Sequence, residues 1–132
     1  MIDIENKIYS PIRTALVNAY DGIYVTSEPT ATSAKFPAVS IVQQDNYTSI
    51  NKMDNSGTEQ FATVMFQVDV YSNKASGRKS QCKEIMGVID TMLYQLNFTR
   101  LSLTPIPMAN EGYYRLSARY RAETDGTNLY RV

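Results

Sequence analysis

The chain has no histidine, no tryptophan and a single cysteine, Cys82, among its 132 residues. One cysteine cannot form an intramolecular disulfide, and without histidine no nucleophile can use a histidine base. Zinc prefers cysteine and histidine ligands, so we predict no metal site and no cofactor. Carboxylate-only acid–base chemistry is compatible with the composition, but Asp45 and Asp54 fall in a polar segment and Asp69 on the polar side of a strand pattern, which favours solvated roles. We therefore expect a protein that is not an enzyme.

The sequence also lacks an excess of charge and any long apolar run. Thirteen lysines and arginines balance thirteen aspartates and glutamates, whereas general nucleic-acid binders and proteins held on anionic membranes by charge carry a basic excess. No apolar run approaches the about 20 residues of a membrane-spanning helix. Residues 1–6 have neither the basic start nor the apolar core of a signal peptide. We expect a protein made and kept in a cytoplasm, with no membrane partner.

Alternation of apolar and polar residues is the clearest positive signal in the chain. Between residues 61 and 71 one face carries Val64, Phe66, Val68 and Val70, and the other carries Thr63, Met65, Gln67 and Asp69. A period of two over this length predicts a strand with one buried face. A second long strand is predicted at residues 113–121, with alternating faces of Tyr114, Leu116, Ala118, Tyr120 and Arg115, Ser117, Arg119, Arg121. Shorter strands are predicted at residues 23–26, 38–43, 101–106 and 128–132.

Two segments have apolar residues at helical spacing. The first stripe consists of Ile4, Ile8, Ile12, Ala15, Leu16 and Ala19. Pro11 either bends one helix that begins near Asp3 or opens a shorter helix capped by Ser10, and the common phase of the stripe favours one bent helix. The second helix is predicted to begin at a Ser76 cap, and its stripe consists of Cys82, Ile85, Met86, Ile89, Met92, Leu93 and Leu96. Gly87 inside this helix indicates close packing against the sheet or a neighbouring subunit.

The order of elements predicts a single α+β domain over residues 1–132. The order is α-β-β-β-α-β-β, and short connections favour an antiparallel sheet with both helices on one face. The other face would be left for solvent or a partner. Residues 44–58 are predicted to form a long polar loop, and residues 123–132 a turn and a short strand.

Two features of the predicted surface point to contacts with other molecules. Arg115, Arg119 and Arg121 form either a basic strip or a set of partners for Asp69 and Gln67, and the zero net charge favours pairing. Ten tyrosines are too many for the core of a chain this short, and tyrosine is favoured at protein interfaces. The candidate partner-contact residues on the loop are Asp45, Asn46, Tyr47, Asn51, Lys52, Met53 and Asp54.

Several segments together resemble a known family. They are Phe-Pro-Ala-Val-Ser-Ile-Val at 36–42, the alternating strand at 61–71, Ser-Gly-Arg-Lys at 76–79 and the closing strand at 113–121. In this order, over nearly the whole chain, they are similar to the tail terminator (tail completion) proteins of long-tailed bacteriophages. Small head–tail connector or head-completion proteins of the neck have similar size and composition and are the alternative. A small ligand-binding domain or a carboxylate-dependent enzyme is a third possibility.

The resemblance implies a structural protein of the virion. Its members form a homohexameric ring that caps the tail tube, ends tube polymerisation and offers a surface for head–tail joining. The implied partners are further copies of the chain, the tail tube protein and a head-completion or neck protein, and DNA would pass through the ring without specific binding. The implied location is the head-proximal end of the tail, with the host cytoplasm as the place of assembly.

Overall fold

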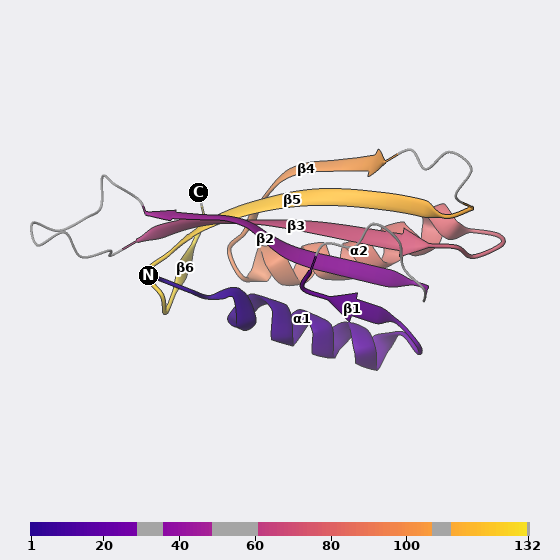
Figure 1. Ribbon diagram of the computed structural model, residues 1–132, viewed down its shortest axis with the longest axis horizontal. Coiled ribbons are helices and arrows are strands. Elements are labelled where there is room, and N and C mark those ends of the chain that lie inside the picture. The colour runs from indigo at the N-terminus through magenta and orange to yellow at the C-terminus, as the bar shows by residue number, and fades with distance from the viewer. Residues whose placement is uncertain (29–35, 49–60, 107–111, 132) are drawn as a thin grey trace, which may run out of the picture.

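The computed structural model of the protein describes residues 1–28, 36–48, 61–106 and 112–131. Within these residues the chain forms one mixed sheet covered on one face by two helices (Figure 1). The predicted α+β class and the predicted order of helices and strands are confirmed.

The first helix, α1 (Glu5–Ala19), is continuous across Pro11, so a shorter helix that begins at Ser10 is excluded. It turns Ile8, Ile12 and Leu16 toward the sheet, as the predicted stripe requires. The second helix, α2 (Arg78–Gln95), begins after Gly77 rather than at a Ser76 cap. Gly77 has φ of 83°, a left-handed conformation that glycine adopts without the steric cost of a side chain. The chain thus enters α2 through a backbone turn, and no side chain caps the helix.

The sheet has the order β1-β2-β3-β5-β4, and β6 pairs with the far end of β5. The strands are β1 (Tyr24–Thr26), β2 (Ala38–Thr48), β3 (Ala62–Ser72), β4 (Thr99–Ile106), β5 (Tyr114–Thr124) and β6 (Leu129–Tyr130). The two strands with the clearest alternation, β3 and β5, lie side by side in the middle and pair antiparallel along their whole length. The order ends at β1 on one side and at β4 on the other.

Two features of the sheet differ from the prediction. β1 pairs with β2 in parallel, so the sheet is mixed and not wholly antiparallel. The connection at 27–37 is long enough to return the chain to the same end of the sheet, as a parallel pair requires. In addition, β2 continues to Thr48, so residues 44–48, predicted to begin the long loop, belong to a strand. A bulge between Gln43 and Asp45 shifts the alternation by one residue, and this hid the strand from the sequence pattern.

The core lies between the sheet and the two helices. The predicted inner faces of β3 and β5 are buried, and they meet the predicted stripe of α2, of which Cys82, Ile85, Met86, Ile89 and Leu93 are buried. Phe66 of β3 packs edge-on against Phe98 with ring centres 5.6 Å apart. Because both helices cover the same face, the opposite face of the sheet carries no helix in the described part of the chain. We call it the helix-free face.

Candidate functional site

The predicted partner-contact residues fall partly in β2 and partly outside the described residues. Asp45 and Tyr47 sit opposite Met65 and Thr63, which places both on the helix-free face. Tyr47 has 46% of its surface exposed. Asn46 points the other way, and its Nδ2 donates a hydrogen bond of 2.7 Å to the carbonyl of Ile2. The structure therefore does not bring these three residues together as one contact surface.

The remaining four predicted contact residues, Asn51, Lys52, Met53 and Asp54, lie outside the described residues. Their role as a contact surface stays a prediction.

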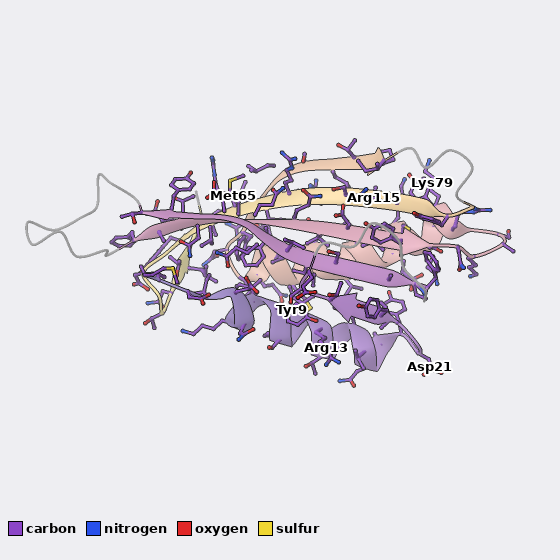
Figure 2. The ribbon with its side chains drawn as sticks, in the orientation of Figure 1. Tyr9, Arg13, Asp21, Met65, Lys79 and Arg115 are labelled. Atoms are coloured by element: carbon purple, nitrogen blue, oxygen red, sulfur yellow. The ribbon has the colours of Figure 1, made fainter. Side chains whose placement is uncertain are left out.

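A buried ion pair organises one end of the helix-free face. Asp69, predicted to be solvated, is only 6% exposed and pairs with Arg115 at 3.3 Å. Gln67 Nε2 donates a hydrogen bond of 3.0 Å to the same carboxylate oxygen, Oδ2. The Arg115 guanidinium also lies over the Tyr71 ring, 5.5 Å from its centre. Figure 2 shows Arg115 at β5, with β2 and β3 between it and Arg13 of α1.

The environment of Asp69 explains why the sequence pattern was misleading. Alternation identifies the face on which a residue lies, but not how far its neighbours extend over it. Tyr71, which follows on the same face of β3, is itself only 1% exposed and contacts the ring of Tyr113. Burial, followed by the charge of Asp69, raises the pKa of Tyr71, so its hydroxyl remains protonated at neutral pH. Asp69, Tyr71 and Tyr113 therefore form a polar and aromatic cluster at this end of the helix-free face, and Arg115 beside them is partly exposed.

The two other arginines of β5 differ from Arg115. Arg119 is exposed, and neither Arg119 nor Arg121 forms an ion pair with any residue that the structure describes. The Nε atom of Arg121 is buried without a hydrogen-bond acceptor among the described residues. The predicted pairing with Asp69 is thus confirmed for one arginine of the three.

The outer edge of β4 is the most open part of the sheet. Among the residues that the structure describes, β4 pairs with β5 on one side and with no strand on the other, and all but its first and last residues are exposed. An unpaired strand edge presents backbone N–H and C=O groups that can pair with another chain. Leu101 and Leu103 on this strand are 42% and 43% exposed, although alternation in the sequence gave no sign that they would be. Pro105 near the end of β4 fits an edge position, because proline cannot donate a ladder hydrogen bond.

A shallow apolar groove of about 240 Å³ lies beside this edge, between β4 and α2. Met86, Gly87, Leu103 and Leu116 line it, with charged side chains around them. A Cβ atom built on Gly87 would meet nothing within 4 Å. Of the two predicted roles of this glycine, close packing against the sheet is therefore wrong. We call Met86, Gly87, Leu101 and Leu103 together the β4 edge surface.

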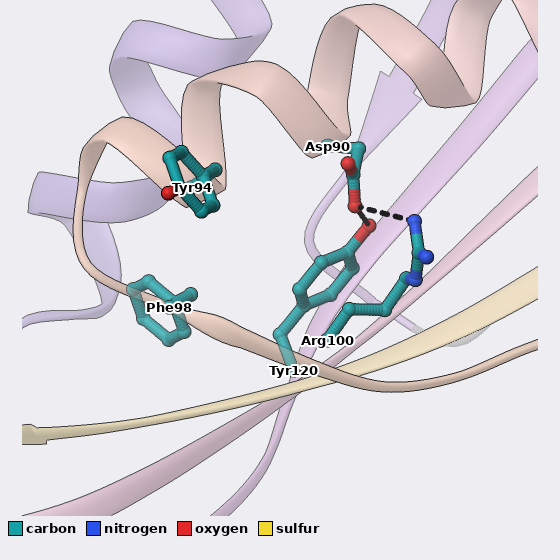
Figure 3. Close-up of a pocket in the computed structure, with 5 residues that line it drawn as sticks. All are labelled: Asp90, Tyr94, Phe98, Arg100 and Tyr120. Carbon is teal, nitrogen blue, oxygen red and sulfur yellow. Dashed lines mark hydrogen bonds and ion pairs between the residues drawn. The ribbon is translucent and has the colours of Figure 1, made fainter. Parts of the chain in front are cut away.

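A second pocket, of about 160 Å³, is lined by Asp90, Tyr94, Phe98, Arg100 and Tyr120 (Figure 3). Asp90 Oδ1 accepts a 2.8 Å hydrogen bond from the Tyr120 hydroxyl and a 3.2 Å bond from Arg100 Nη1. Burial raises the pKa of Tyr120 far above its usual value, and the hydrogen bond to Asp90 adds to the effect. The polar groups of Asp90, Arg100 and Tyr120 are thus engaged with each other. This arrangement serves to connect α2 with β4 and β5.

The chemistry available for catalysis or metal binding is limited in the described residues. They contain no group of three or more cysteine, aspartate or glutamate side chains placed to hold a metal ion. Cys82 is buried, and its thiol donates toward the carbonyl oxygens of Val70 and Tyr114 at 3.6 and 3.5 Å. Burial raises the pKa of Cys82 to about 12, so the thiol is not a nucleophile at neutral pH. Cys82 is therefore a core residue, as its place in the predicted apolar stripe of the second helix requires.

Comparison with known proteins leaves the function to be argued from these surfaces. No protein-family model matches the sequence, and no curated protein matches it significantly. In the part of the chain that the structure describes, no helix combines the length and apolarity needed to cross a bilayer.

Proposed function

We propose that the protein is a non-enzymatic tail terminator of a long-tailed bacteriophage that works as a homohexameric ring. The sequence resemblance suggests this role, and the observation that carries it is the β4 edge surface. An eight-residue strand with one unpaired edge lies next to two exposed leucines and an apolar groove. Such a surface is suited to binding another protein and offers nothing for chemistry.

The shape of the sheet supports a ring in particular. Its two outermost strands differ, because β4 has eight residues and β1 has three. A contact between the β4 edge surface and a different surface of the next copy is heterologous, and such a contact closes a ring when its rotation divides a full turn evenly without translation. Gly87 is consistent with this arrangement, since a glycine in open space on a helix allows a neighbouring backbone to come close.

The proposed mechanism is steric. The ring occupies the end of the tail tube, so no further tube subunit can add, and its outer surface then receives the head-completion or neck protein. DNA passes through the hole without specific binding, for which a chain of zero net charge is suited. The contact with the tube is assigned to the segment that connects β2 and β3, which includes Lys52 and Met53.

Replacement of Leu103 tests the ring. Leu103→Lys places a charge in the apolar groove, and we expect it to convert the assembled wild-type protein into monomers while the circular dichroism spectrum stays unchanged. Light scattering coupled to gel filtration measures the mass. Val17→Lys is the matched control, because Val17 is a 44% exposed apolar residue on α1, away from β4. A wild-type protein that is monomeric at every concentration, or a Leu103→Lys variant that assembles normally, would contradict the proposal.

Termination itself can be measured with purified tail tube protein. Wild-type protein added to polymerising tube should shorten the tubes and appear at one end of them in negative-stain images. The Leu103→Lys variant should do neither. If rings form but bind only to the head vertex, the neck connector is the better description of the function.

A further inference from the structure

A polar pocket lies on the helix-free face, opposite to the face of β4 that carries the apolar groove. It has a volume of about 260 Å³ and lies over β4, β5 and the neighbouring part of β3. Its polar lining consists of Gln67, Ser102, Thr104, Arg115, Ser117 and Arg119. Five of these six side chains bring a hydroxyl or guanidinium donor, and none of the six is a carboxylate.

The strand register holds these donors together. Ser102 lies directly opposite Arg119, and Thr104 lies directly opposite Ser117. Such cross-strand neighbours have Cβ atoms about 5 Å apart. Arg115 and Arg119 lie on the same face of β5 as Ser117, two residues before it and two residues after it. The site is therefore built on two paired strands rather than on a loop, and its geometry is fixed by the sheet.

Few hydrogen-bond acceptors among the described residues bind the donors of the pocket. The hydroxyls of Ser102, Thr104 and Ser117 make no hydrogen bond with any described residue. The nearby carboxylate, Asp69, is buried and already engaged by Arg115 and Gln67. Since Asp69 balances Arg115, the charge of Arg119 is left without a partner in the described part of the chain. The pocket therefore combines one unbalanced positive charge with several free donors, which is the chemistry of an oxyanion site.

We propose that this pocket binds a carboxylate from an acidic side chain of a partner protein. The charge of the surrounding face favours a carboxylate over a nucleic acid. In the described strands the helix-free face carries three arginines, Arg115, Arg119 and Arg121, and three carboxylates, Asp45, Asp69 and Glu123. A phosphate backbone has a charge at every nucleotide and would lie against these carboxylates as well as the arginines. A single acidic side chain meets only the donors.

The experiment uses N-acetylglutamate amide as the probe, with N-acetylglutamine amide as its uncharged match. Each is titrated into isotope-labelled full-length protein, and the backbone amide shifts of Ser102, Thr104 and Ser117 are followed by NMR. We expect saturable shifts with a millimolar dissociation constant for the glutamate probe and none for the glutamine probe. Arg119→Gln should weaken binding by about fivefold or more, because it removes a charge-assisted hydrogen bond. Arg13→Gln, an equal loss of charge on α1, should leave it unchanged.

Three outcomes would overturn the proposal. They are a glutamate probe that produces no saturable shift, equal shifts from the two probes, and equal weakening by the Arg13 and Arg119 substitutions. A short DNA duplex is titrated in parallel. Duplex binding at the same amides, far tighter than the glutamate probe and steeply dependent on salt, would assign the site to nucleic acid instead. The measurement does not require a ring, so its result stands apart from the test of Leu103.

Discussion

Asp69 shows how much a single side chain of this fold depends on its partners. Its carboxylate is nearly closed off from solvent and is bound by Arg115 and Gln67. Removal of one member of a buried pair leaves the other charge uncompensated, which costs far more than the loss of a surface pair.

We predict that Asp69→Asn lowers the free energy of unfolding by about 2 kcal/mol, somewhat below the value for a fully buried pair because Arg115 retains some exposure. Urea denaturation measures the change. Asp45→Asn, on the same face but exposed, is the control and should change stability by less than about 0.5 kcal/mol. A change at Asp69 as small as that at Asp45 would mean that the ion pair contributes little to stability.

The environments of single residues were the hardest feature to predict from the sequence. It predicted pairing of the three arginines of β5 with residues such as Asp69 from strand alternation, and the structure confirms this for Arg115 alone. It could not foresee the burial of Asp69, because burial depends on Tyr71 and on long side chains that arrive from β5. Nor could it foresee that Gly87 faces open space, since helical spacing alone does not say how far the neighbouring strand extends.

At the scale of elements, α1 contains a proline in its interior. Pro11 has no backbone N–H, so the carbonyl of Lys7 cannot receive the usual helical hydrogen bond from it. The ring of Pro11 lies on the exposed side of the helix, while Ile8 and Ile12 on either side of it are buried. The proline thus contributes little packing to offset the missing bond.

We predict that Pro11→Ala raises the free energy of unfolding by about 1–2 kcal/mol, less than the full helix-propensity difference because alanine also leaves the unfolded chain freer. The midpoint of urea denaturation reports the change. Ser10→Ala is the matched control and should change the free energy of unfolding by about 0.5 kcal/mol or less, because it alters helix propensity alone. If Pro11→Ala instead destabilises the protein, the helix needs the shape that proline imposes in order to pack against the sheet.

The helices and strands themselves could largely be predicted, because each has a strong local pattern. Apolar stripes located both helices, and alternation located β3 and β5. The predictions that were wrong concern features that depend on non-local geometry. The direction of β1 depends on its partner strand, and the bulge in β2 interrupts the alternation at the point where the strand turns polar. Pro105 in the predicted strand at 101–106 indicates an edge strand, and β4 does lie at the end of the strand order. The exposure of Leu101 and Leu103 could not be foreseen, because they have the pattern of a covered strand.

At the scale of the whole molecule, the segment that connects β2 and β3 is the proposed contact with the tail tube. Replacement of residues 50–57 by a short glycine–serine linker leaves the paired residues of β2 and β3 intact. We predict that the variant keeps the oligomeric state and the melting temperature of the wild-type protein but shortens polymerising tubes less effectively. Both properties are measured on the same preparation, by light scattering and by tube lengths in negative-stain images. Undiminished capping would show that the tube is bound by another surface.

The position of β5 between β3 and β4 has a consequence for how the protein is made. β5 is synthesised after both of the strands between which it lies. In the chain β3 and α2 come first, β4 follows, and β5 comes after β4. Until residue 124 has been synthesised, β3 has a free side and β4 has no partner at all. The nascent chain therefore passes through a stage with unsatisfied strands and an uncovered apolar layer, and cellular chaperones have most reason to bind it then.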